Sequence, residues 1–195
     1  MMILQTIQGI AAIKPRFMTM VFVFLLASCG GAGRVDMEAL SSAATNGNID
    51  AQYELGKAYL DSGMLEDKQK AAAVFELAAG EQHAGAQYEL GMMYYRGEGV
   101  IQDYRYSHDL FVSAARQNNP DAQFMLGWIY QYGKGVELDV MQAHMWYNIA
   151  ASNGHTEAME SRASIAKAMT KEQVEEAQTR ARALQAQLRG KISRV

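Results

Sequence analysis

The residues of this sequence best suited to chemistry are four histidines and one cysteine. His108 and His144 occupy equivalent positions in two similar segments, and His83 and His155 fall in polar stretches between such segments. Equivalent positions on stacked helices lie about 10 Å apart, which is too far to share a zinc ion whose ligand bonds are about 2 Å long. We therefore interpret the four histidines as structural or surface residues, and we expect no metal and no cofactor.

Motifs of known catalytic sites are not found. The sequence contains neither G-x-S-x-G nor H-E-x-x-H, which position a nucleophile or a zinc ion. Residues 97–100 read Gly-Glu-Gly-Val but lack the Lys-Ser/Thr pair that completes a phosphate-binding loop. A hydrolase needs a nucleophile and a base that converge, and no such pair is evident. The sequence therefore predicts that the protein is not an enzyme.

The single cysteine, Cys29, stands at the end of an apolar run. Lys14 and Arg16 precede this run, which covers residues 17–27. Its length fits the core of a signal peptide and falls short of the ~20 residues with which a helix spans a bilayer. We therefore predict that residues 1–28 form a signal peptide.

The residues Leu26-Ala27-Ser28-Cys29 resemble the bacterial lipoprotein signal, in which a leucine and two small residues precede the cysteine. The resemblance implies cleavage after Ser28, a diacylglyceryl group on the sulfur of Cys29 and an acyl group on its new amine. Several acyl chains anchor a protein stably, so the membrane becomes a partner through Cys29. The alternatives are an ordinary cleaved signal peptide and an uncleaved helix with a chance cysteine.

This anchor places the protein in the bacterial envelope, facing the periplasm. Gly30 favours the outer membrane, because the lipoprotein resemblance implies that an acidic residue after the cysteine would favour the inner membrane. Residues 29–38 are predicted to form a short, Gly-rich tether before the folded part.

Charge is distributed unevenly along the chain. Residues 29–160 carry 8 basic and 18 acidic residues, a balance of −10, whereas residues 161–195 carry 8 basic and 3 acidic residues, a balance of +5. Nucleic acids require a cationic surface, so the acidic body argues against a nucleic-acid partner. The basic end is interpreted as a solvated helix face.

A nine-residue segment occurs three times in this sequence. Each copy begins with Ala-Gln, continues through an aromatic residue and a Leu-Gly pair, and closes with tyrosine; the copies cover residues 51–59, 86–94 and 122–130. A second motif follows each copy, at residues 71–79, 107–115 and 143–151. Apolar positions recur at the 3.6-residue spacing of an α-helix, so each unit is predicted to be a helix, a turn and a second helix.

Two features indicate how these helices begin and pack. The recurrent glycine costs ~1 kcal/mol inside a helix, so its return at the same place indicates that another helix packs closely there. Asp67, Asp103 and Asp139 precede the second helices and suit N-cap positions. The positions predicted to maintain the repeat are Leu55, Gly56, Tyr59, Leu90, Gly91, Tyr94, Leu126, Gly127 and Tyr130.

These motifs resemble the Sel-one-like repeat, a relative of the tetratricopeptide repeat with a longer Gly turn. The resemblance implies an all-α fold, an α/α solenoid of about three helix-turn-helix repeats with C-terminal capping helices. We predict the repeat array over residues 39–158, with residues 39–51 as a truncated half-repeat, and the capping helices and basic tail over residues 159–195. The first repeat departs from the pattern, because residues 61–64 lack the Gly pair of the later turns.

The last segment has the features of a cap. Arg162 and Ala163 replace the Leu-Gly pair there, so stacking is expected to stop. Thr170 and Gln173 fit a capping box. The helix that follows has an apolar seam at alternating steps of three and four, formed by Val174, Ala177, Ala181, Leu184 and Leu188. We interpret this seam as capping the last repeat, with self-association through residues 174–188 as the alternative.

One strip of the first helices belongs to neither stacking face. The strip is charged in the first repeat and apolar in the third. Trp is enriched at binding hot spots, and Met suits adaptable surfaces. We therefore predict a groove for a partner around Met92, Met125, Trp128 and Tyr132. The alternative is that Trp128 packs under the C-terminal helices.

Together these features favour a non-catalytic scaffold or adaptor for protein–protein interaction, lipid-anchored in the bacterial envelope. Its partner is an unidentified protein or peptide. The alternative is a peptidoglycan-associated binding protein or a regulator of an envelope enzyme, neither of which needs a catalytic group of its own.

Overall fold

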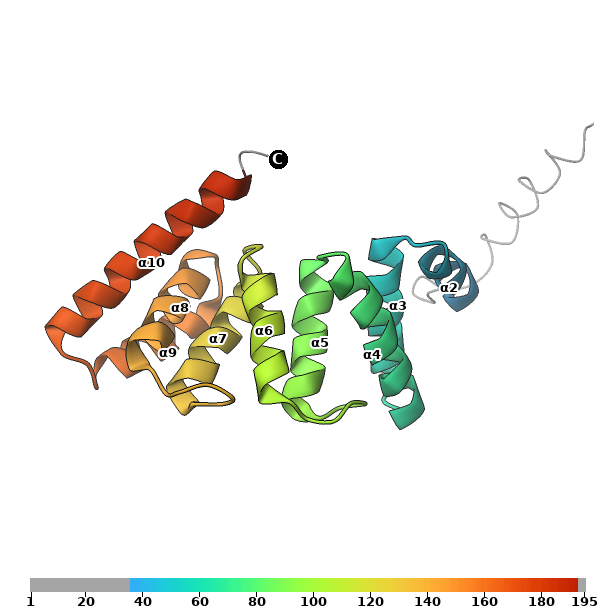
Figure 1. Ribbon diagram of the computed structural model, residues 1–195, viewed down its shortest axis with the longest axis horizontal. Coiled ribbons are helices and arrows are strands. Elements are labelled where there is room, and N and C mark those ends of the chain that lie inside the picture. Colours follow the sequence, from blue (N-terminus) through green and yellow to red (C-terminus); the bar gives the residue numbers. More distant parts are fainter. Residues whose placement is uncertain (1–35, 193–195) are drawn as a thin grey trace, which may run out of the picture. The chain divides into compact units, whose positions relative to one another are not determined.

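The computed structural model describes residues 36–192, and all regular elements within this range are α-helices (Figure 1). These are α2 (Met37–Thr45), α3 (Ile49–Asp61), α4 (Leu65–Gly80), α5 (Ala84–Arg96), α6 (Tyr104–Ala115), α7 (Pro120–Tyr132), α8 (Val140–Ser152), α9 (Thr156–Ala166) and α10 (Lys171–Ile192). The first of them begins slightly before the predicted start of the array. Asp36 allows this, because its carboxylate accepts hydrogen bonds from the backbone N–H groups of Glu38 and Ala39.

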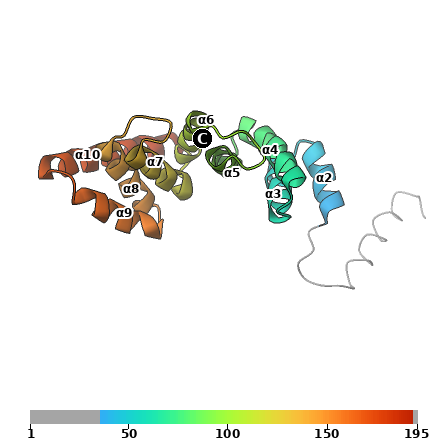
Figure 2. The same ribbon diagram turned by 90° about the horizontal axis from the view of Figure 1, so that it is seen from below.

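Helices α3 to α8 form three antiparallel pairs that follow one another in chain order (Figure 1, Figure 2). The pairs are α3 with α4, α5 with α6, and α7 with α8, and contacts of α4 with α5 and of α6 with α7 join each pair to the next. Helix α2 packs against α3 as the predicted half-repeat. The predicted all-α solenoid of three helix-turn-helix repeats is therefore confirmed.

In each repeat, an aromatic ring of the second helix lies directly against the glycine of the first helix. A Cβ atom built on Gly91 would lie 2.8 Å from a ring carbon of Phe111, closer than real Cβ contacts allow. The other two pairs are Gly56 with Phe75 and Gly127 with Tyr147, at 2.5 Å each. All three rings are fully buried. Close packing of a second helix is thus confirmed as the reason for the recurrent glycine.

The turns inside the second and third repeats end the first helix with glycine and begin the second with aspartate. Gly97 and Gly133 adopt left-handed backbone at the C-caps, with φ of 71° and 62°, a conformation that costs glycine little. Asp103 and Asp139 accept hydrogen bonds from backbone N–H groups at the start of α6 and α8. Both predicted N-caps are confirmed.

The first repeat has a shorter turn, and here the predicted N-cap Asp67 is wrong. Helix α4 begins at Leu65, with Met64 at the N-cap position and no side chain bonded to the helix end. Asp67 lies instead within the first helical turn, where it pairs with Lys70 at 3.2 Å. Because residues 62–64 alone connect α3 to α4, the second helix begins earlier than in the other repeats.

A buried glutamine in each first helix ties consecutive turns together, a set of contacts that we call the glutamine links. Nε2 of Gln87 donates to the carbonyl of Ala79 at 3.2 Å, and Oε1 of Gln87 accepts from the side-chain amide of Gln117 at 2.8 Å. Gln123 makes the same two bonds with Ala115 and Asn153.

The first glutamine link is incomplete. Gln52 donates to the carbonyl of Ala44 at 3.2 Å, but its buried Oε1 has no hydrogen-bond partner within residues 36–192. The position that corresponds to Gln117 is occupied here by Glu81. An ionised carboxylate has no hydrogen to donate, so Glu81 cannot complete the link.

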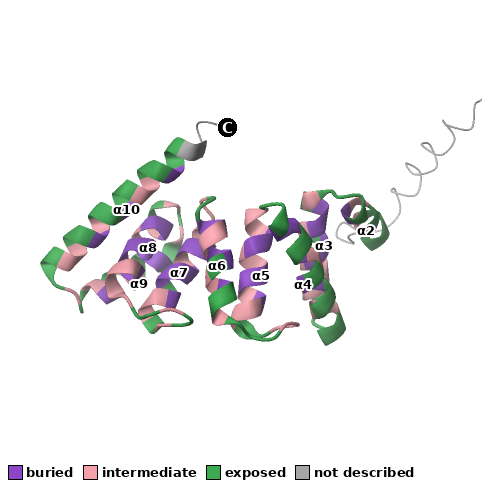
Figure 3. Cartoon of the chain, viewed as in Figure 1, coloured by how far each residue is buried: buried purple, intermediate pink, exposed green. Residues whose placement is uncertain are grey.

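The C-terminal helices cap the third repeat. Thr170 and Gln173 form the predicted capping box: Thr170 Oγ1 accepts from the N–H of Gln173 at 3.3 Å, and Gln173 Oε1 accepts from the N–H of Thr170 at 2.9 Å. Helix α10 packs along α8, with Ala177, Ala181 and Leu188 buried and much of its remaining surface exposed (Figure 3). The chain's own α8 therefore occupies the seam, while self-association through residues 174–188 stays a prediction.

Gly91→Ala should destabilise the protein by about 1–3 kcal/mol, because the ring of Phe111 leaves no room for a methyl group and overpacking costs this much. Gly80→Ala is the matched control, since a Cβ atom there meets nothing within 4 Å and alanine favours a helix over glycine by ~1 kcal/mol. Urea unfolding followed by circular dichroism measures both variants. Equal stabilities would contradict the close-packing explanation.

Glu81→Gln should stabilise the protein by about 1 kcal/mol, because its amide supplies the donor that Gln52 Oε1 lacks. Gln117→Glu should destabilise it by about 1–3 kcal/mol, since Gln87 Oε1 then stays buried without a donor. The thermal unfolding midpoints of the two single variants measure these effects. Shifts of the same sign in both variants would show that the glutamine links do not act as described.

Candidate partner-binding surface

The residues of the predicted partner groove do not share one environment. Trp128 and Tyr132 are exposed on α7, at 37% and 47%, and Met92 on α5 is half-buried. Met125 is only 9% exposed, because it packs into the core cluster that also contains Ile129. Met125 therefore offers almost no surface to a partner, which corrects its place in the predicted groove.

The exposed residues belong to a larger group, which we call the aromatic patch: Tyr95, Tyr104, Trp128 and Tyr132. The indole Nε1 of Trp128 donates to the hydroxyl of Tyr95 at 3.0 Å, and its ring centroid lies 4.3 Å from that of Tyr132. Tyr95 in turn packs edge-to-face on Tyr104 at 5.3 Å, and the Nζ of Lys134 lies 5.6 Å from the Tyr104 centroid. The patch thus joins the end of α5, the start of α6 and the end of α7.

These contacts bear on the alternative that the C-terminal helices cover Trp128. The indole is exposed, and its hydrogen bond runs to Tyr95 of the preceding repeat, so this alternative is not supported. Tyr95 and Tyr104 were not predicted as part of the surface. Tyr95 lies three residues after Met92 and therefore on the same helix face, a signal that the sequence contained. Tyr104 follows a loop, where helical spacing gives no guidance.

The strip that leads to the aromatic patch is charged at its start. Lys57 and Glu54 form an ion pair of 3.6 Å on α3. Glu89 follows on α5, where burial raises the pKa of its carboxyl and the charges of Lys57 and Arg96 oppose this rise. The strip thus begins with charged side chains and ends at the exposed Trp128, whereas Met125, predicted as part of its apolar end, is buried.

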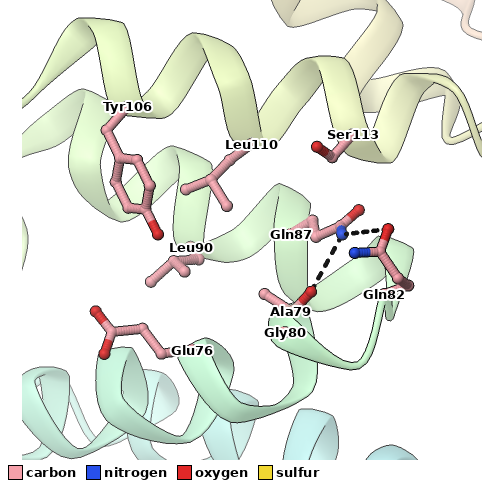
Figure 4. A pocket seen from close by; sticks show the side chains of 9 residues that line it. All are labelled: Glu76, Ala79, Gly80, Gln82, Gln87, Leu90, Tyr106, Leu110 and Ser113. Atoms are coloured by element: carbon pink, nitrogen blue, oxygen red, sulfur yellow. Dashed lines mark hydrogen bonds between the residues drawn. The ribbon is translucent and has the colours of Figure 1, made fainter.

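A second feature lies between α4 and α6, beside α5 (Figure 4), and we call it the α4–α6 hollow. Its volume is about 450 Å³. Figure 4 shows Glu76 and Tyr106 at one end, Gln82 and Gln87 at the other, and leucine side chains between them. The hollow was not predicted, because it depends on side chains that meet from two different repeats.

The carboxylate end of the α4–α6 hollow is held by tyrosine contacts. The hydroxyl of Tyr94 donates to Oε1 of Glu76 at 3.1 Å, and the Tyr94 ring meets Tyr106 edge-to-face at 4.7 Å. Burial raises the pKa of Tyr94, and the neighbouring Glu76 raises it further. Tyr94 therefore stays a neutral hydrogen-bond donor that orients Glu76.

Two of the four histidines cap helices. Nδ1 of His83 accepts from the backbone N–H of Ala86 at 3.0 Å at the start of α5, and Nδ1 of His155 accepts from Ala158 at 3.3 Å at the start of α9. Each imidazole also packs on an aromatic ring, His83 on Tyr53 of α3 and His155 on Phe124 of α7. These contacts agree with the structural interpretation of both residues.

The other two histidines lie in the second helices. Nε2 of His108 lies 3.1 Å from the hydroxyl of Tyr130. His144 is 2% exposed, and its pKa is lowered by burial and by the charge of Arg162. Among residues 36–192, no group of three or more His, Cys, Asp and Glu side chains is arranged to hold a metal ion.

The repeated motifs and helix pairs match a known family. The sequence model of the Sel1 repeat matches residues 49–83, 84–119 and 120–155. The chain belongs to the Sel1 repeat family. Its three Sel1 repeats coincide with the pairs α3–α4, α5–α6 and α7–α8.

Several solved structures resemble this Sel1 array. A Sel1 repeat protein from Oxalobacter formigenes is 35% identical, with a TM-score of 0.59, and the match covers 66% of this chain and 98% of that one. A protective antigen present in uropathogenic Escherichia coli strains, displaying an SLR fold, is 32% identical with a TM-score of 0.74. That match covers 76% of this chain and 32% of the other, so the chain spans about a third of that structure's length.

A more distant structure shares the Sel1 fold alone. Cysteine-rich protein B from Helicobacter pylori is 23% identical with a TM-score of 0.51, over 66% of this chain and 98% of that one. No curated protein sequence matches the chain.

The positions predicted to maintain the Sel1 repeats contribute to the core of the array. Leu55, Leu90 and Leu126 are 4%, 1% and 0% exposed, beside the three close-packed glycines. Tyr59, Tyr94 and Tyr130 are half-buried.

The predicted signal peptide and lipidated cysteine lie in another part of the chain. Cys29 and the tether up to residue 35 fall outside the described residues. Within the described part, no helix combines the length and the apolar character needed to cross a membrane.

Proposed function

We propose that this Sel1 repeat protein is a non-catalytic scaffold that binds a protein or peptide through the aromatic patch. The exposed indole of Trp128 carries the proposal. It is oriented by the hydroxyl of Tyr95 and the ring of Tyr132, so it needs little ordering on binding. Buried aromatic anchors provide much of the free energy of protein–protein association. The repeats give the patch a rigid support, since their cores are closely packed.

We further propose that the array is held at the bacterial envelope by lipid on Cys29. The residues Leu26-Ala27-Ser28-Cys29, after an apolar run preceded by Lys14 and Arg16, support this proposal. Gly30 favours the outer membrane, with the array facing the periplasm.

Trp128→Ala should reduce capture of the partner from detergent-solubilised envelopes by at least about tenfold, because a Trp hot spot contributes about 2 kcal/mol or more. Met159→Ala is the control, since it removes an apolar side chain that is 50% exposed on α9 and should leave capture unchanged. Mass spectrometry identifies the captured protein, and circular dichroism checks that both variants fold. Unchanged capture by folded Trp128→Ala would contradict the proposal.

The same variants separate the scaffold from the alternative function. Co-sedimentation of the wild type with purified sacculi, lost in Trp128→Ala and kept in Met159→Ala, would favour a peptidoglycan-associated binding protein. Capture of one protein without binding to sacculi favours the scaffold.

Cys29→Ser should abolish incorporation of radiolabelled palmitate, because serine has no thiol to carry the diacylglyceryl group. Trp128→Ala serves as the control and should be labelled like the wild type, since it leaves the signal unchanged. Label that persists in Cys29→Ser would show that the lipid is not carried by this residue.

A further inference from the structure

The α4–α6 hollow is a property of particular side chains rather than of stacked helices in general. One repeat further along, Trp146 and Ile149 stand at the positions of Leu110 and Ser113. Trp146 and Ile149 are 7% and 0% exposed and belong to the core. Val112 there takes the place of Glu76 and packs against the same core. Large apolar side chains therefore fill the junction between the second and third repeats, whereas the junction between the first and second repeats stays open.

The open junction has a carboxylate at one end and two leucines along its middle. Leu90 and Leu110 line the middle of the hollow, but they are 1% and 8% exposed and offer little surface of their own. The side chain of Glu76 stands at its end, and within residues 36–192 its one partner is the neutral hydroxyl of Tyr94. No Lys, Arg or His side chain of residues 36–190 forms an ion pair with it.

An aromatic ring completes this end of the hollow. Tyr106 is 43% exposed and stands across the hollow from Glu76 (Figure 4). A cation near an aromatic face gains roughly 0.5–2 kcal/mol, and guanidinium groups also bind carboxylates through paired hydrogen bonds. Long basic side chains bury their methylene stems on apolar surfaces and keep the charged head at a polar site.

We propose that the α4–α6 hollow binds an arginine side chain of a partner protein, with its guanidinium between Glu76 and Tyr106 and its stem in the middle of the hollow. The charge of the chain fits this occupant, because residues 29–160 carry a balance of −10 and attract basic partners over long distances. The site is formed mainly by the second helices, whereas the aromatic patch is formed mainly by the first. It is therefore independent of the proposed function of that patch.

The test is a titration of the full chain in detergent micelles, followed by NMR. The probe is N-acetyl-arginine N-methylamide, and N-acetyl-citrulline N-methylamide is its neutral counterpart of nearly the same shape. The methyl signals of Leu90 and Leu110 and the side-chain amide of Gln82 should shift and saturate with the arginine probe. A single side chain binds weakly, with a Kd in the range of about 1 mM or above. The citrulline probe should bind about tenfold more weakly, because it lacks the charge-assisted bonds.

Two variants make the result specific. Glu76→Gln keeps the shape of the side chain and its capacity to accept from Tyr94, and should weaken binding of the arginine probe about tenfold. Glu160→Gln removes an exposed carboxylate on α9 and should leave binding unchanged. Leu110→Trp, which copies the closed junction at Trp146, should abolish the shifts, and Ser113→Ile replaces it where the larger change prevents folding.

Three results would overturn the proposal: no saturable shift with the arginine probe, equal binding of the two probes, or equal binding by wild type and Glu76→Gln. The aromatic patch provides a separate test of the proposed scaffold function. Trp128→Ala should bind the arginine probe like the wild type. Partner capture by Trp128→Ala therefore tests the scaffold proposal, and probe binding by Glu76→Gln tests the hollow, and either result can fail without the other.

Discussion

The contact between a helical glycine and a buried ring is the interaction on which the rest of this array depends. The missing side chain allows the first helix of each repeat to lie against the ring of the second, and the ring fills the interface completely. A glycine has no rotamers through which the fit could be adjusted, so the separation of the two helices is narrowly determined. Three copies of one contact therefore give three equivalent helix pairs, each able to stack on the next.

Positions outside that contact are free to differ, and the surface features arise there. Met92 on α5 becomes Trp128 at the equivalent position on α7, which creates the centre of the aromatic patch. Leu110 on α6 becomes Trp146 on α8, which closes the space that remains open beside Leu110. The stacked helices keep the same arrangement in every repeat. Single differences between repeats determine where the surface has an indole, a carboxylate or a filled core.

Features that depend on residues close in sequence were predictable. Asp103 as an N-cap and Thr170 with Gln173 as a capping box follow from spacing within one turn of helix, and both are present. The prediction of Asp67 as an N-cap was wrong, because the turn is shorter in the first repeat and its second helix begins earlier. Met125 and the α4–α6 hollow depend on side chains that meet from different helices, and the periodicity of one helix does not show how far a shared core extends.

The incomplete glutamine link at Gln52 makes the array mechanically uneven. Gln87 and Gln123 each join the turn before their repeat to the turn after it, so a load applied along the array is shared between two side-chain hydrogen bonds at each of these points. Gln52 is joined on one side alone. The compliant joint therefore lies within the first repeat, towards the end of the chain that leads to Cys29. A pull on that end would be absorbed by α2 to α4, while the repeats that carry the aromatic patch keep their spacing.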